Sequence, residues 1–202
     1  MKNKKKVYLV LSLWLLSSCF NVQTKKDVIL EFKAAYLRPI DCVFKNIYGG
    51  GALFGPELTW NIFRSVYGFA SYNYFTKNGK SIGLNTPTKA TMQVLAVGLK
   101  FMGCVAHHAR LYGGLGFEPI YLYTKNCSPY VVQETKKWGF GGIAKFGAYI
   151  DLPHNVVLDL FADYSFVKVS PGCCTNPNLY VQQTKADVSG FIFGAGVGYN
   201  FN

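Results

Sequence analysis

Charged side chains that could transfer protons or bind ions lie among the alternate, non-apolar positions of several short segments, one or two in each segment. Ten of them share the face opposite the apolar residues: Glu31, Lys33, Glu57, Lys100, Arg110, Glu118, Lys145, Asp151, Asp159 and Asp163. This spacing places the two sets on opposite faces of an extended strand. Six carboxylates against four basic groups are close to balance, so we expect ion pairs if the set is buried, because an unpaired buried charge costs several kcal/mol. The alternative is a path for ions or protons along the charged face.

The residues needed for acid–base catalysis or metal binding do not come together in this pattern. Catalytic proton transfer commonly uses histidines or carboxylate clusters, but His107, His108 and His154 all fall in expected turns. Asp159 and Asp163 lie four residues apart on one strand without a histidine beside them, which favours ion pairing over catalysis. The His107-His108 pair supplies only two adjacent ligands, too few for a metal site. We therefore predict no catalytic residues, no metal, no cofactor and no enzymatic activity.

The last segment, residues 188–201, shows the alternation most clearly. One face carries apolar residues: Phe191, Phe193, Ala195, Val197, Tyr199 and Phe201. The other face is mostly glycine: Gly190, Ile192, Gly194, Gly196, Gly198 and Asn200. Glycine weakens strands that face water, so we expect the glycine face inside a crowded interior and the aromatic face outside. Outward aromatic residues and an inward small or polar face are typical of a membrane barrel strand.

Seven earlier segments repeat this alternation: 28–37, 54–63, 66–75, 89–101, 110–120, 138–152 and 156–166. Strands of about 10 residues can cross a bilayer at a tilt near 45°. The connections after the second, fourth and sixth segments are short or moderate, and the others are long. The sequence therefore predicts an all-β fold, a membrane-spanning antiparallel up-and-down barrel of eight strands, with termini and short turns periplasmic and long loops extracellular. A soluble eight-stranded barrel such as a lipocalin is the alternative, but it would need a solvated exterior.

The closing segment also resembles the last strand of bacterial outer-membrane barrels, in which a terminal aromatic residue serves as an assembly signal. Tyr199 and Phe201 carry this resemblance, although Asn202 follows Phe201 here. By its pattern, the region 20–202 resembles the eight-stranded barrels of the OmpA, OmpX and opacity-protein type (outer membrane protein β-barrel domain). The resemblance implies a Gram-negative outer membrane, its lipid and lipopolysaccharide, and the barrel-assembly machinery as partners.

The N-terminus has the features of a secretory signal peptide, which we expect to cover residues 1–19. A basic head (Lys2, Lys4, Lys5, Lys6) precedes an apolar run of about 10 residues, too short to span a bilayer as a helix. An uncleaved anchor is the alternative to ordinary cleavage. The sequence Leu16-Ser17-Ser18-Cys19 also resembles a lipoprotein cleavage box, which would make Cys19 a lipidation site.

Most cysteines of the barrel region fall in the expected external loops, where disulfides can form. Cys42, Cys127, Cys173 and Cys174 allow three pairings. Free thiols or cross-links between molecules are the alternatives. Cys104 falls by itself in an expected periplasmic turn.

The positive charge is also concentrated at the expected external end. The chain has 21 basic and 10 acidic residues; without the four lysines of the signal, 17 basic residues remain and the net charge is +7. The external connections hold ten basic residues (Arg38, Lys45, Lys77, Lys80, Lys89, Lys125, Lys136, Lys137, Lys168, Lys185) and three acidic ones (Asp41, Glu134, Asp187). Such an excess attracts polyanions, either lipopolysaccharide phosphates or host molecules. Ordinary solubilising lysines are the alternative.

Together these features predict a non-enzymatic, monomeric outer-membrane barrel that acts as a surface antigen, an adhesin or an envelope-stabilising protein, without a nucleic-acid partner. The second hypothesis is a narrow channel for ions or small solutes, because charged residues share the inner face. The third is an outer-membrane lipid-modifying enzyme.

Overall fold

The structure is a computed structural model that describes residues 27–80, 86–126, 134–169 and 186–201. The expected signal peptide, the lipidation candidate Cys19, three of the disulfide candidates (Cys127, Cys173, Cys174) and Lys185 lie outside the described residues. Among the described residues, no helix has the length and apolar character needed to cross a membrane.

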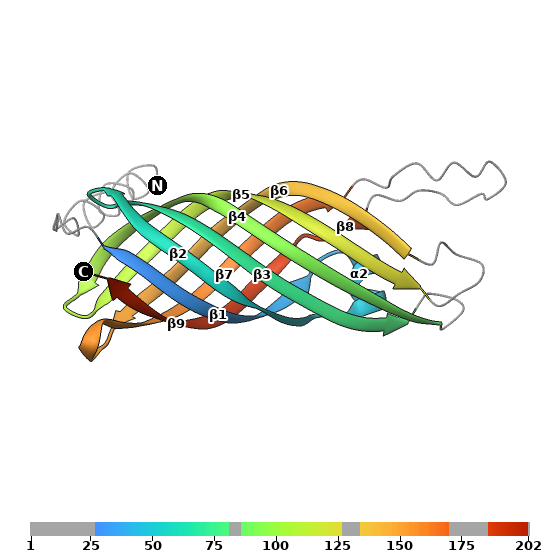
Figure 1. The fold of residues 1–202 in the computed structure, drawn as a ribbon, viewed down its shortest axis with the longest axis horizontal. Helices are drawn as coiled ribbons and strands as arrows, with labels where there is room; N and C mark the ends of the chain where they lie inside the picture. Colours follow the sequence, from blue (N-terminus) through green and yellow to red (C-terminus); the bar gives the residue numbers. More distant parts are fainter. Residues whose placement is uncertain (1–26, 81–85, 127–133, 170–185, 202) are drawn as a thin grey trace, which may run out of the picture.

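Eight long antiparallel strands form one closed ring (Figure 1). They are β1 (Val28–Pro39), β2 (Gly51–Phe63), β3 (Val66–Lys80), β4 (Pro87–Ala106), β5 (Ala109–Asn126), β6 (Glu134–Asp151), β7 (Val156–Val169) and β9 (Gly190–Phe201). Each strand pairs with the next along the chain, and β9 pairs with β1 to close the ring. We name the end of the barrel that holds the C-terminus the inner end and the opposite end the outer end (Figure 1). The two-residue strand β8 (Ala186–Asp187) adds to β7 at the outer end. The predicted antiparallel up-and-down barrel of eight strands is confirmed.

The two faces of the closing strand β9 lie as the alternation predicts. Phe193 is 48% exposed on the outside, whereas its neighbour Ile192 is buried in the interior. The inward glycines make room for interior side chains from other strands. A Cβ atom at Gly198 would lie 2.7 Å from the Cβ of Glu31, and one at Gly194 would lie 2.7 Å from the ring of Phe161. Glycine is therefore required there by the crowding of the barrel interior.

The predicted strand ends are wrong on one side of the barrel, because β3, β4, β5 and β6 run past the expected loop boundaries. The segment 76–80 was expected in a polar loop but pairs with 87–91, and 121–125 pairs with 134–138. These polar and aromatic residues continue the backbone ladder beyond the apolar band, so the wall of β3 to β6 projects at the outer end (Figure 1). At the other end, Ala106 pairs with Ala109, so the connection expected to be of moderate length is a two-residue turn at His107 and His108.

The long connection expected between the first two strands contains a short helix, α2 (Cys42–Tyr48), at the outer mouth (Figure 1). Asp41 caps its first turn by accepting a hydrogen bond from the backbone N–H of Phe44 at 2.9 Å. The helix ends at Gly49, whose φ of 65° suits glycine. The Phe44 side chain is buried, and the Tyr48 hydroxyl lies 3.1 Å from the Thr88 hydroxyl of β4. These contacts hold the helix against the barrel rim.

Candidate functional site: a buried charge network and a basic outer end

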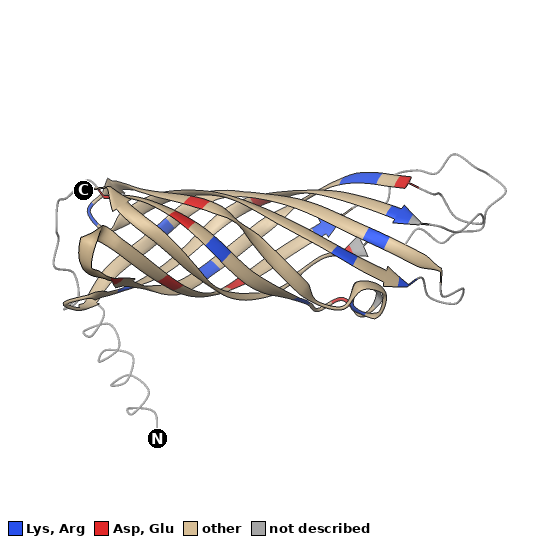
Figure 2. Cartoon of the chain, turned by 60° about the horizontal axis from the view of Figure 1, so that its bottom comes forward, with Lys and Arg blue, Asp and Glu red and all other residues tan. Residues whose placement is uncertain are grey.

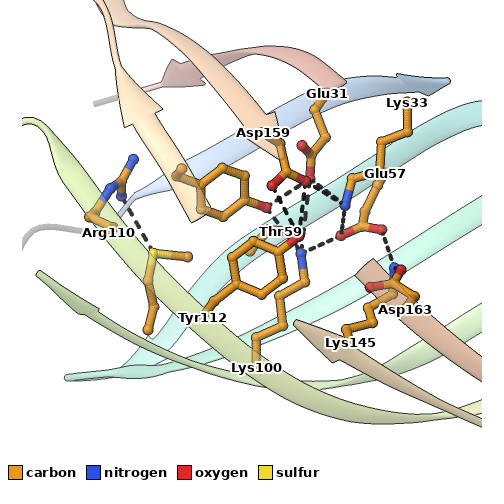
Figure 3. A network of polar contacts seen from close by, with 12 residues as sticks. Glu31, Lys33, Glu57, Thr59, Lys100, Arg110, Tyr112, Lys145, Asp159 and Asp163 are labelled. Atoms are coloured by element: carbon orange, nitrogen blue, oxygen red, sulfur yellow. Dashed lines mark hydrogen bonds and ion pairs between the residues drawn. The ribbon is translucent and has the colours of Figure 1, made fainter. Parts of the chain in front are cut away.

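Inward-pointing charged residues gather in the interior of the barrel. The structure places all nine candidate lumen residues in buried positions: Glu31, Lys33, Glu57, Lys100, Arg110, Glu118, Lys145, Asp159 and Asp163. They come from β1, β2, β4, β5, β6 and β7, so each strand contributes only one or two of them. Figure 3 shows most of them converging from opposite walls.

Glu57 of β2 is the hub of the network and is only 1% exposed. One of its oxygens accepts a hydrogen bond from Lys100 and lies 3.1 Å from the Lys33 ammonium. Its other oxygen accepts a hydrogen bond from Lys145 at 2.8 Å. Three ammonium groups around one carboxylate make Glu57 the most heavily paired acid in the described part of the barrel.

The remaining carboxylates complete the pairing of these lysines. Lys33 lies 2.8 Å from Asp159 and 3.4 Å from Glu31. Lys145 donates a hydrogen bond to Asp163 at 3.0 Å. Such a network compensates most of the cost of removing these charges from water, provided that the remaining polar atoms are also bonded.

Two tyrosines supply some of those additional hydrogen bonds, whereas Glu31 Oε2 has no hydrogen-bond partner. The Tyr149 hydroxyl donates to Glu31 at 2.8 Å and accepts from Lys100 at 3.0 Å. The Tyr112 hydroxyl lies 3.0 Å from both oxygens of Asp159. Sequence reasoning did not include either tyrosine in the site, because tyrosines also face outward in this barrel. Their place on the same face of the strand as the charged residues was the available signal.

A separate ion-pair group lies at the inner end of the lumen. Arg110 donates a hydrogen bond to Asp151, lies 3.5 Å from Asp27, and contacts the sulfur of Met102. Asp151 is partly exposed there. This group therefore sits at the edge of solvent, whereas the central network does not.

Glu118 of β5 differs from the other central acids. It is 1% exposed and is hydrogen-bonded to Ser165, but it makes no ion pair with any described residue. Its second carboxylate oxygen, Oε2, has no hydrogen-bond partner. Glu118 lies at the boundary between the charge network and the outer part of the interior.

The outer part of the interior is apolar. Its buried side chains include Leu37, Leu53, Phe75, Met92, Val94, Ile120, Leu122, Val167, Val169, Val188 and Ile192. A cavity of about 20 Å³ lies between this layer and the charge network, lined by residues of both. It has room for about one water molecule. The interior thus has a polar inner part and an apolar outer layer.

Basic residues gather at the outer end, opposite the C-terminus (Figure 2). The described residues there include nine basic ones (Arg38, Lys45, Lys77, Lys80, Lys89, Lys125, Lys136, Lys137, Lys168) and three acidic ones (Asp41, Glu134, Asp187). Their expected position in loops is wrong for most of them, because they lie on the projecting strand ends.

The register brings several of these lysines close together on the outer wall. Lys89 of β4 lies directly opposite Lys125 of β5. Lys125 has a weak exposed ion pair with Glu134, at 3.9 Å. Lys136 lies 5.9 Å from the ring centre of Tyr123. Like charges on directly opposite strand positions repel each other, and an anion between them would relieve this repulsion.

The other candidates lie apart from the charge network. The rings of His107 and His108 lie 4.5 Å apart and tilted by 59° at the β4–β5 turn, and His154 has a φ of 64° in the β6–β7 turn. Cys42 and Cys104 are exposed, and no disulfide joins them within the described ranges. Those ranges also contain no group of three or more His, Cys, Asp or Glu residues arranged to hold a metal ion. The assembly-signal candidates Tyr199 and Phe201 lie exposed at the end of β9.

No protein-family model matches the chain, and no curated protein matches it. Solved structures do match it in fold. OprG from Pseudomonas aeruginosa aligns with a TM-score of 0.61 and 17% identity over 88% of this chain and 96% of that one. Neisserial surface protein A aligns with a TM-score of 0.59 and 14% identity over 86% and 97%.

A third match is Ail, the attachment invasion locus protein of Yersinia pestis, solved in complex with the heparin analogue sucrose octasulfate. It aligns with a TM-score of 0.56 and 14% identity over 88% of this chain and all of that one. At these identities the likeness is one of fold. The closed antiparallel ring, its inward charges and these alignments together show that the chain has the fold of the eight-stranded outer-membrane β-barrels of the OmpA/OmpX type.

Proposed function

We propose that this chain is a closed, non-enzymatic barrel of the bacterial outer membrane whose basic outer end binds polyanions at the cell surface. The observation that carries the proposal is the positive charge at that end, where the described residues include nine basic and three acidic ones. A surface of one sign attracts oppositely charged molecules over a distance set by the ionic strength.

The exterior of the barrel supports placement in a membrane. Outward-facing Leu95, Leu99 and Phe101 of β4 are each at least 48% exposed, and Val105 ends the same apolar row. Ten residues at about 3.3 Å each, tilted by about 45°, cover roughly 23 Å along the membrane normal. That height is close to the apolar band of about 25 Å in outer-membrane barrels. The long projecting strands would then face the outside and the short turns the periplasm.

The partner that fits the outer end carries several phosphate or sulfate groups. Lys89, Lys125 and Lys136 on the wall lie near the expected level of lipopolysaccharide head groups, whereas Lys77 lies at the mouth beside Gly51. Ail, a barrel of the same fold, has been solved with a sulfated heparin analogue. If the bound polyanion belongs to the host, the protein acts as an adhesin. If it belongs to the bacterium, the protein stabilises the envelope.

A narrow channel is the second candidate, because the inner part of the lumen is lined with charges. The apolar layer of Leu53, Ile120 and Ile192 above those charges argues against it. An eight-stranded barrel has an interior just wide enough for its own side chains. We therefore propose a closed lumen.

The test is binding of the refolded protein to heparin and to phosphorylated lipid A at low and high salt. Changing Lys77, Lys80, Lys136 and Lys137 to Gln lowers the described outer-end charge from +6 to +2. If each exposed contact contributes about 0.5 kcal/mol, the loss is about 2 kcal/mol, or roughly thirtyfold in affinity at low salt. Arg at the same four positions is the matched control and should preserve binding. Unchanged affinity and unchanged salt dependence in the Gln variant would show that these residues are only solvated surface.

A further inference from the structure

We propose that Glu118 is a proton-binding site in the barrel interior: its carboxyl group carries a proton at neutral pH and donates a hydrogen bond into the adjacent cavity. The proposal does not depend on polyanion binding, since it concerns only the described interior. It rests on the pairing of Glu118, the charge of the network and the lining of the cavity.

Glu118 is the one central carboxylate without an ion pair among the described residues. Glu31, Glu57, Asp159 and Asp163 each lie within 3.5 Å of at least one lysine nitrogen. Glu118 has only the Ser165 hydroxyl on one oxygen, and its Oε2 is buried without a partner. An isolated ionised carboxylate in such surroundings is strongly unfavourable, and a group in this position neutralises by taking up a proton.

The charges of the whole central network lead to the same conclusion. Five carboxylates (Glu31, Glu57, Glu118, Asp159, Asp163) and three lysines (Lys33, Lys100, Lys145) lie there, each at most 3% exposed. Fully ionised, this set has a net charge of −2. Glu31 also has a buried Oε2 without a partner, but it lies 3.4 Å from Lys33 and accepts a hydrogen bond from Tyr149. Glu118 has no ion pair among the described residues, so it is the first place for a neutralising proton.

The cavity beside Glu118 has room for a water molecule that can accept a hydrogen bond from the protonated carboxyl group. Its volume of about 20 Å³ fits one water molecule, and its polar lining includes Glu118, Asp163 and Ser165. Lys33 and Lys145 also line it, so their ammonium groups repel a metal cation. A proton bound covalently to the carboxyl group neutralises Glu118 without occupying the cavity and allows Oε2 to donate a hydrogen bond to a water molecule.

The groups that face Glu118 across the cavity come from several strands. The charged or polar ones are Lys33 of β1, Asn73 of β3, Lys145 of β6, and Asp163 and Ser165 of β7. Strands β2, β4 and β9 contribute the apolar Leu53, Met92, Val94 and Ile192. Loss of the proton would place a negative charge directly beneath the apolar layer. The proton therefore keeps a charge away from this layer, and alkaline pH should destabilise it.

Infrared spectroscopy of the refolded barrel in lipid tests the assignment directly. At neutral pH we expect a carbonyl stretch of a protonated carboxylic acid, absent in Glu118→Gln and present in the matched surface control Glu134→Gln. Gln is a neutral mimic of protonated Glu, so Glu118→Gln should also refold with the wild-type yield. Absence of the band in wild type, its persistence in Glu118→Gln, or failure of that variant to refold would each overturn the proposal.

The same samples distinguish a proton on Glu118 from a metal cation bound beside an ionised Glu118. Replacing Na⁺ by a bulky organic cation should leave the acid band and the unfolding midpoint unchanged. Raising the pH should remove the band and lower the wild-type midpoint more than that of Glu118→Gln. A midpoint that follows Na⁺ in the absence of an acid band would assign a bound cation and overturn the proton site.

Discussion

Replacing Glu57 by Gln should destabilise the barrel strongly, because this carboxylate contacts all three central lysines. Lys33 would keep Asp159 at 2.8 Å, and Lys145 would keep Asp163 at 3.0 Å. Lys100 would keep its hydrogen bonds to Tyr149 and Thr59, but its one remaining charged partner would be Glu31 at 3.9 Å. Removing one partner of a buried ion pair typically costs about 3–5 kcal/mol. Because two of the three lysines keep a close partner, we expect a loss at the lower end, about 3 kcal/mol.

The same geometry predicts which second change would restore stability. Lys100→Met removes the orphaned ammonium and places a flexible apolar side chain among Phe69, Tyr112 and Tyr149, whose rings already lie 4.4–5.5 Å from the Lys100 nitrogen. The double variant Glu57→Gln/Lys100→Met should therefore be more stable than Glu57→Gln, with a coupling of at least about 1 kcal/mol between the two sites.

Equilibrium unfolding in urea, in lipid vesicles, measures these differences. Trp60 and Trp138 lie on the outer face of the barrel, so their fluorescence reports its loss from the bilayer. The exposed Glu134→Gln variant is the control and should stay within about 0.5 kcal/mol of wild type. A Glu57→Gln variant as stable as this control, or a double variant that loses the sum of the single effects, would contradict the network described above.

Three further results are expected. Arg at Leu160 or Phe193, on the lipid-facing side, should lower the stability of the barrel by about 2–4 kcal/mol. Val at Gly194 should prevent correct folding, because its side chain would crowd Phe161 in the interior. Equal tolerance of substitutions on both faces in the same unfolding assay would refute the assignment of the two strand faces. Planar-bilayer recordings should show no stable single-channel steps, and reproducible conductance that changes in Lys145→Gln would favour the channel. Phe44→Ala should detach α2 from the mouth and speed proteolysis there while the rest of the barrel stays resistant; unchanged cleavage would show that the helix is not held by its buried ring.

The barrel could be predicted from the sequence because its main signal is local. The alternation in residues 188–201 and the glycine face opposite the aromatic one need no knowledge of the partner strands. The ends of the strands were not predictable in the same way. Residues 76–80, Thr-Lys-Asn-Gly-Lys, have a composition typical of a turn, and they form a strand because 87–91 lies beside them. The seven-residue helix α2 is too short to show a helical period.

The pairing inside the lumen was also beyond sequence reasoning. Alternation places Glu57 and Lys145 on inner faces, but they are 88 residues apart and lie on non-adjacent strands. Their contact depends on the register of every strand between them and on the tilt of the barrel. The unpaired state of Glu118 depends on the same geometry, because only the relative height of each side chain decides which acids reach a lysine.

The central claim, that the barrel spans the outer membrane with its basic end outside, is tested most directly by thiol labelling of intact cells. Cys42 and Cys104 are exposed at opposite ends of the barrel. Two variants are needed, each with one of these two cysteines and with all other cysteines changed to Ser. Intact cells that express each variant are then treated with a membrane-impermeant maleimide. We expect Cys42 to react on intact cells and Cys104 to react only after the outer membrane is permeabilised. Labelling of Cys104 but not Cys42 on intact cells would contradict the proposed orientation.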